Sequence, residues 1–201
     1  MIVIGIDIGF GGGISIIDAI KDNIIDMIPM PVCEDKKWID SKKIYEIFNE
    51  YNNKHKDNVI VVVEKQQRNP SSIAQEGALY ALSEVAIGNV YSVHPTKWQS
   101  DLSLKQENKY NKEYGYDYII EKYPKQKSII PSKTKTKYVF HDGCCDALLI
   151  AIWYIKIGYM ENTIETEEEW KRGFLYKLRI IQKIPLCAKG VKDVNNVIRR
   201  A

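Results

Sequence analysis

The sequence IVIGIDIG, over residues 2–9, is the strongest indication of the fold. Its residues are nearly all apolar as far as Asp7, and such a run is typical of a strand buried on both faces. The glycine-rich residues 9–13 form a turn, and apolar strand patterns resume over residues 14–18 and 24–30. These segments predict a three-stranded antiparallel meander whose first strand ends in a carboxylate.

Strand and helix patterns alternate along the rest of the chain. A helix begins at Asp40 or Ser41 and runs to about Tyr51, because its apolar residues recur at helical spacing after a capping side chain. The later segments are a strand over residues 58–64, a helix that starts at residues 69–71 and continues over 73–87, and a short strand over 90–93. A polar helix from about Lys105 to Tyr123 and an apolar helix over 142–157 follow. This order predicts an α/β fold with a mixed, five-stranded central sheet flanked by helices.

The composition is that of a folded protein with one main domain. The chain has 201 residues, of which 45% are hydrophobic and 27% are charged, and no apolar run is as long as a membrane span. Residue 1 leads directly into a strand pattern and not into a signal peptide. We therefore expect an intracellular protein without a membrane partner, with a domain over residues 1–158 and a basic extension over residues 159–201.

Positive charge is concentrated in two segments, although the net charge is only +3. Residues 122–137 contain six lysines and no acid, and residues 170–201 contain nine Lys or Arg residues and one acid. Cationic segments of this kind can bind a polyanion, such as a nucleic acid, through its phosphates. A solvated lysine-rich surface is the alternative interpretation. The candidate phosphate contacts in the first segment are Lys133, Lys135 and Lys137.

Four acidic residues are attached to apolar elements, where a carboxylate without a partner is costly. Asp7 and Glu64 end core strands. Asp142 and Asp146 are four residues apart, so they share one face of the final helix. The four side chains can therefore converge on one point. The alternative interpretation makes Asp7 a turn residue, Glu64 a strand-end acid and Asp142 a helix cap.

A shared cation would explain such a convergence. Carboxylate oxygens suit Mg²⁺ or Mn²⁺, whereas Zn²⁺ prefers Cys or His ligands. Two such ions about 4 Å apart can activate a water molecule and stabilise the leaving oxygen of a phosphodiester. The pattern therefore indicates a metal-dependent enzyme whose metal ligands are Asp7, Glu64, Asp142 and Asp146.

The ordered set of motifs resembles the RuvC-like Holliday junction resolvases of the ribonuclease H-like superfamily. The set consists of Asp7 on the first strand, Glu64 at the end of the fourth, and Asp142-x-x-x-Asp146-Ala147-Leu148 opening the last helix. Glu64-Lys65-Gln66 is similar to the Glu-basic-Gln sequence of poxviral and mitochondrial members, and residues 141–151 are similar to compact phage and viral members. The resemblance covers roughly residues 2–157.

The resemblance implies a ribonuclease H-like fold and a crossover junction endodeoxyribonuclease. Such an enzyme resolves Holliday junctions and related branched DNA by paired nicks in recombination, replication and repair. It acts as a homodimer with two Mg²⁺ ions in each active site. The protein is then located at DNA, in the host cytoplasm or a viral factory if it is viral, as the Ile-, Lys- and Asn-rich composition hints.

Polar residues near the acids in the sequence are further candidates. His141 is a further catalytic candidate, with a locally hydrogen-bonded helix-entry histidine as the alternative. Gln66 and Arg68 can line the branch-point opening, and Lys97 and Lys112 can neutralise phosphates; a polar loop and solvated lysines are the corresponding alternatives.

One position departs from the family pattern. Family members often carry an acid or a histidine three residues before the final aspartate, whereas this chain has Gly143 there. Asp142, one residue earlier, has to serve instead.

Two rival functions remain open. Asp7-Ile8-Gly9, followed by Gly11 to Gly13, is also similar to the phosphate-binding turn of actin-like kinases and ATPases. That reading makes the protein an ATP-binding phosphotransferase, although such enzymes need a second nucleotide-binding half. The other rival is a module that binds DNA junctions without cutting them, against which the retained acids argue.

Overall fold

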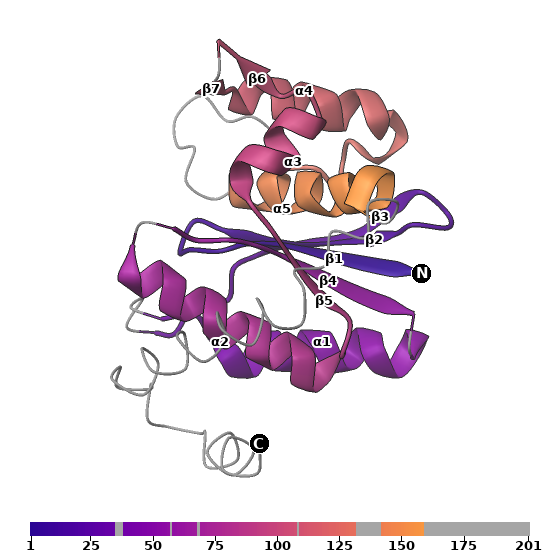
Figure 1. The fold of residues 1–201 in the computed structure, drawn as a ribbon. Helices are drawn as coiled ribbons and strands as arrows, with labels where there is room; N and C mark the ends of the chain where they lie inside the picture. The colour runs from indigo at the N-terminus through magenta and orange to yellow at the C-terminus, as the bar shows by residue number, and fades with distance from the viewer. Residues whose placement is uncertain (35–37, 57, 68, 108, 132–141, 159–201) are drawn as a thin grey trace.

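The computed structural model describes residues 1–34, 38–56, 58–67, 69–107, 109–131 and 142–158. A central five-stranded sheet carries helices on both faces (Figure 1). The strands are β1 (Ile2–Asp7), β2 (Gly13–Asp18), β3 (Asn23–Pro29), β4 (Val59–Glu64) and β5 (Val90–Val93), in the order β3-β2-β1-β4-β5. The first three strands pair antiparallel, whereas β4 runs parallel to β1 and β5 parallel to β4. The predicted mixed sheet is confirmed.

The helices form a layer on each face of the sheet. Helices α1 (Ser41–His55) and α2 (Pro70–Ala86) cover one face, and α5 (Asp142–Trp153) covers the other, with α3 (Pro95–Asp101) and α4 (Lys112–Lys122) outside α5 (Figure 1). A 3-10 turn, Pro124–Gln126, follows α4, and a π-helical turn, Tyr154–Gly158, continues α5. Helix α5 contacts β1, β2, α3 and α4, so it is the central element of its layer.

Alternation along β1 divides the core between the two faces. Ile2, Ile4 and Ile6 belong to the apolar cluster on the side of α1 and α2, whereas Val3 belongs to the cluster around α5. All four side chains are buried. The strand is therefore buried on both faces, as its apolar sequence predicts.

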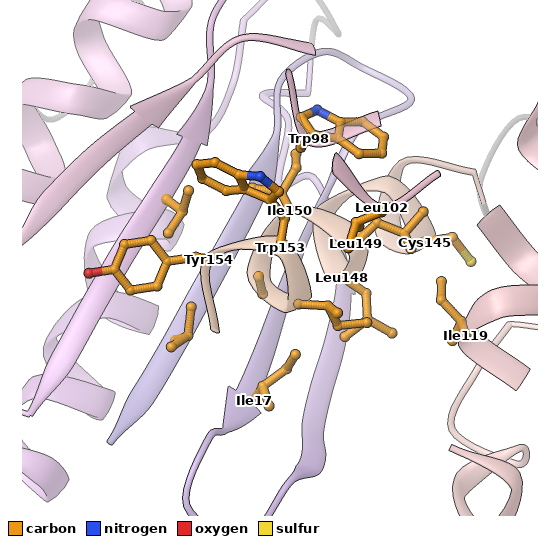
Figure 2. Packing of buried hydrophobic residues seen from close by; sticks show 14 of the residues in the cluster. Ile17, Trp98, Leu102, Ile119, Cys145, Leu148, Leu149, Ile150, Trp153 and Tyr154 are labelled. Atoms are coloured by element: carbon orange, nitrogen blue, oxygen red, sulfur yellow. The ribbon is translucent and has the colours of Figure 1, made fainter. Parts of the chain in front are cut away.

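Helix α5 supplies much of the second cluster. Leu148, Leu149, Ile150 and Trp153 are fully buried, and Figure 2 shows them packed together with residues of the sheet, α3 and α4. Burying an aliphatic side chain of this size contributes about 1.5–3 kcal/mol, so α5 is a major source of stability.

Helix α5 also lies so close to the sheet that glycine is required at the contact points. A Cβ added at Gly5 of β1 would lie 2.0 Å from the carbonyl oxygen of Ala147. One added at Gly13 of β2 would lie 2.7 Å from the Cα of Cys144. One added at Gly143 would lie 2.2 Å from a backbone oxygen of the turn between β1 and β2. Backbone packing therefore explains why residue 143, which departs from the family pattern, is a glycine.

The segment before α4 differs from the prediction. The expected helix from Lys105 begins at Lys112 instead, and residues Lys105–Gln106 (β6) pair with Lys109–Tyr110 (β7) as an antiparallel hairpin. Glu107 has a φ of 48°, which a right-handed helix does not contain. Asn111 then begins α4, because its side chain accepts a hydrogen bond from the N–H of Glu113.

Helix α3 was not predicted as a helix. It begins with Pro95 after His94, whose ring nitrogen accepts a hydrogen bond from the N–H of Thr96. A histidine is not among the residues usually expected to begin a helix, so the sequence pattern does not indicate a helix there.

Some predicted features lie outside the described residues. They are the extension over residues 159–201 and the lysines Lys133, Lys135 and Lys137. The boundary at residue 158 therefore stays a prediction. Among the helices of the described ranges, none has both the length and the apolar character that a membrane crossing requires.

Gly5→Ala tests how far the fold depends on the contact between α5 and β1. A methyl group cannot fit 2.0 Å from a backbone oxygen, so the helix and the strand must move apart. We expect the free energy of unfolding to fall by about 3 kcal/mol or more, at or beyond the upper end of the usual cost of overpacking. Urea unfolding followed by circular dichroism measures this loss.

The matched control is Gly88→Ala. Nothing lies within 4 Å of a Cβ at this position, and the cost comes only from a φ of 83°. That conformation costs an L-residue about 1–2 kcal/mol. Equal losses in the two variants would contradict the importance given to the close contact.

Candidate active site

Two neighbouring strands place Asp7 and Glu64 side by side. Strands β1 and β4 are parallel, and Ile6 pairs with Val63, so the next residue on each strand ends it at the same edge of the sheet. Both side chains are partly buried. The carboxyl edge of parallel strands is the usual position of a functional site in α/β proteins.

Helix α5 brings a third carboxylate to this edge. Asp146 lies near the start of the helix and is buried, with an exposed fraction of 9%. The contacts of α5 with β1 and β2 bring its charge close enough to act on both Asp7 and Glu64. Three of the four predicted acids therefore converge.

Burial raises the pKa values of all three groups, and repulsion from neighbouring carboxylates adds to the rise at Asp7 and Glu64. Burial raises the pKa of Asp7 well above its usual value, and the charges of Glu64 and Asp146 and a hydrogen bond to Glu64 raise it further. Burial likewise raises the pKa of Glu64 and that of Asp146. The positive charge of Lys112 opposes the rise at Asp7 and Asp146. Strongly perturbed acids at a sheet edge are typical of functional sites.

Hydrogen-bond donors hold the oxygens of Glu64 and Asp146. The indole N–H of Trp98 donates to Oε1 of Glu64 at 3.0 Å, and the Gln66 amide donates to Oε2 at 3.2 Å. The hydroxyl of Tyr110 donates to Oδ1 of Asp146. The Lys112 ammonium lies 3.7 Å from Oδ2 of Asp146.

The chemistry of this donor set fits a hard divalent cation. Mg²⁺ prefers carboxylate oxygens, and a cation would relieve the repulsion that adds to the raised pKa values of Asp7 and Glu64. Within the ranges that the structure describes, no group of three or more His, Cys, Asp or Glu side chains already has a ligating arrangement. The oxygens of Glu64 and Asp146 are instead bonded to the protein's own donors.

The other predicted site residues are placed as follows. Gln66 lies beside Glu64, and the backbone N–H of Gln66 donates to Oε2 of the buried Glu76 at 2.8 Å. Lys97 is ion-paired with Asp101 on the same helix, with 3.1 Å between Nζ and Oδ2.

Three predicted residues gain no detail from the structure. Asp142 is the first residue of α5, but its side chain lies outside the described part of the chain. His141 and Arg68 also lie outside the described residues. Their roles stay predictions.

The sequence did not single out two contacts of the site, those of Trp98 and Tyr110. A buried indole needs a hydrogen-bond acceptor, and this is the signal by which the sequence could have pointed to Trp98. Tyr110 was placed in a helix, where its direction toward Asp146 had no sequence signal.

Comparison with known proteins identifies the fold through structure and finds no match in sequence. The sequence matches no family model and no curated protein. In structure, the chain is similar to T. thermophilus RuvC in complex with Holliday junction substrate, with a TM-score of 0.51 and 18% identity over 80% of this chain and 96% of that chain. The fold is therefore RuvC-like and belongs to the ribonuclease H-like class, as predicted.

Asp7→Asn tests the repulsion within the site. The pKa of the Asp7 carboxyl is raised in the folded protein, so this group binds its proton more tightly in the folded state than in the unfolded state. Its favourable effect on stability is therefore complete below the unfolded pKa of about 4 and is lost as the pH rises through the folded pKa. Without added metal, we expect the variant to melt above the wild type at about pH 7.5, by roughly 2–4 °C for each kcal/mol relieved. The difference should shrink toward pH 4.

The control variant is Asp22→Asn, because the pKa of Asp22 is lowered where that of Asp7 is raised. The hydrogen bond from Lys122 lowers the pKa of Asp22, so this carboxylate stabilises the fold above the unfolded pKa and loses that effect in acid. The variant should melt below the wild type at neutral pH. A lower melting temperature for Asp7→Asn as well would argue against repulsion at the site.

Proposed function

On this RuvC-like fold, we propose a divalent-metal-dependent endonuclease that cuts branched DNA, with four-way junctions as its preferred substrate. The observation that carries the proposal is the convergence of Asp7, Glu64 and Asp146 at the carboxyl edge of β1 and β4, with raised pKa values. Neutral residues in place of these acids would make the fold more stable, so the acids are better explained by a function than by a structural role.

In this proposal Asp7, Glu64 and Asp146 bind Mg²⁺ or Mn²⁺, with Asp142 as the fourth ligand and two ions in each site. When bound, the ions activate water and stabilise the charge that develops on a phosphodiester. Glu64 is oriented by Trp98 and Gln66, so its carboxylate is fixed before any substrate arrives. Lys112 lies beside Asp146, where its ammonium can pair with a phosphate oxygen.

The substrate class rests on the likeness to RuvC, whose structure was determined with a Holliday junction. Paired nicks across a four-way junction require two active sites, so we propose a homodimer. Contacts to DNA are proposed for Gln66, Lys97 and Lys112, and for Arg68, Lys133, Lys135 and Lys137 outside the described residues. His141 is proposed beside the scissile phosphate. Membership of the phage and poxvirus branch is part of the same proposal.

Cleavage of a labelled synthetic four-way junction tests the activity. With Mg²⁺, the wild type should produce paired nicks in the junction and leave a linear duplex of the same sequence intact. EDTA should abolish cleavage. Asp146→Asn should lower the rate by roughly 1,000-fold, which corresponds to about 4 kcal/mol of transition-state stabilisation.

The other outcomes favour the rival functions. Junction binding without cleavage would favour a non-catalytic junction-binding module. Neither binding nor cleavage by a folded protein, together with stabilisation by ATP, would favour the actin-like phosphotransferase. Equal cleavage of linear and branched DNA would overturn the junction preference alone.

Binding of Mg²⁺ can be measured without DNA. A ligand that binds only the folded state at about 100 times its Kd stabilises it by about 2.7 kcal/mol. We expect Mg²⁺ to raise the melting temperature of the wild type at neutral pH, and K⁺ at the same ionic strength to have a smaller effect. Asp146→Asn should lose most of the Mg²⁺ effect, because it removes one carboxylate from the site. The same Mg²⁺ effect in both proteins would place the cation elsewhere.

A further inference from the structure

Trp98 is both a core residue and a partner of Glu64. Its side chain is 1% exposed and packs in the apolar cluster around α5 (Figure 2). From there its indole N–H reaches Oε1 of Glu64 at 3.0 Å. Because the ring is buried in the core, this donor is held in place on the side of the carboxylate that faces the protein.

Tyr110 makes the corresponding contact with Asp146. It lies on β7, and its hydroxyl donates to Oδ1 of the carboxylate. Its ring meets the ring of Trp98 edge to face, with 5.2 Å between the centroids and an interplanar angle of 75°. This geometry is favourable for aromatic pairs. The two donors are therefore packed against each other and do not act as separate side chains.

Gly115 on α4 leaves room for the Tyr110 hydroxyl. A Cβ at this position would lie 2.7 Å from the hydroxyl oxygen and 2.9 Å from Cδ1 of Leu149. The hydroxyl thus occupies a narrow space between α4 and α5. A phenylalanine would fill the same ring position without needing this space, so the hydroxyl itself points to a role.

We infer that Trp98 and Tyr110 are positioning residues that orient Glu64 and Asp146 for a divalent cation, an inference that rests on the proposed function. Each aromatic donor holds one oxygen of its carboxylate. The second oxygens meet the Gln66 amide and the Lys112 ammonium, and the Lys112 side chain is 53% exposed. Loss of a donor that orients a metal ligand typically lowers metal affinity by about 10- to 100-fold.

The test compares Tyr110→Phe with Tyr123→Phe in the full-length protein. Both changes remove only a hydroxyl that donates to an aspartate, but Tyr123 donates to Asp22, at 3.0 Å, which is not one of the site's three carboxylates. Mn²⁺ affinity is measured without DNA by the electron paramagnetic resonance signal of the free ion. We expect Tyr110→Phe to weaken Mn²⁺ binding roughly 10- to 100-fold and Tyr123→Phe to leave it unchanged.

A second variant covers the case in which Tyr110→Phe does not fold. Gly115→Ala keeps every donor but displaces the Tyr110 hydroxyl, so it should weaken Mn²⁺ binding in the same direction. Lower melting temperatures with unchanged Mn²⁺ affinity would mean that the ring pair is only structural. Tighter Mn²⁺ binding by Tyr110→Phe would mean that the hydroxyl competes with the cation. Either result overturns the inference.

Wild type and Asp146→Asn separate this inference from the proposed function. If the wild type binds Mn²⁺ no better than Asp146→Asn, the metal site itself is wrong. If the wild type binds Mn²⁺, Asp146→Asn does not, and Tyr110→Phe matches the wild type, only the positioning role fails.

Discussion

The backbone of α5 lies in close contact with strands β1 and β2, and both the core and the candidate site require this contact. Glycine at positions 5, 13 and 143 removes the side chains that would hold the helix away from the sheet. Because the helix can approach so closely, Asp146 reaches the edge where Asp7 ends β1. The same approach closes the apolar core between α5 and the sheet. Packing and the candidate site therefore depend on one contact.

The three carboxyls of the candidate site lower the stability of the fold. Three partly or fully buried carboxyls act on one another, and burial raises the pKa of each. A fold can hold such a cluster only where other interactions are strong. Here the cluster lies next to Trp98, Leu148 and Leu149, which are fully buried, and the hydrogen bonds to Glu64 and Asp146 partly offset the loss of water. The apolar packing and these hydrogen bonds together allow the fold to keep the three acids.

The sequence predicted the elements well where the apolar pattern was long, and less well where polar residues dominate. The strands ending in Asp7 and Glu64 and the apolar helix from Asp142 were predicted because alternation and apolar runs report directly on burial. The segment from Lys105 to Tyr110 was predicted as helix because polar residues fit a helix surface as well as a hairpin. The positive φ of Glu107 is compatible with the hairpin and not with a helix, and no local sequence pattern predicts it.

Sequence patterns alone are enough to predict the order of the strands along the chain, the apolar faces and the strand-end positions of Asp7 and Glu64. They also place Asp146 near the start of α5. These are local properties, set by the period of each element. The requirement for glycine at position 143 becomes visible in the folded chain, where α5 meets the turn between β1 and β2. The contacts of Trp98, Tyr110 and Lys112 with the carboxylates are likewise visible only there. Such contacts join segments far apart in the chain, and they depend on packing depth and side-chain direction, which the sequence pattern of one segment does not record.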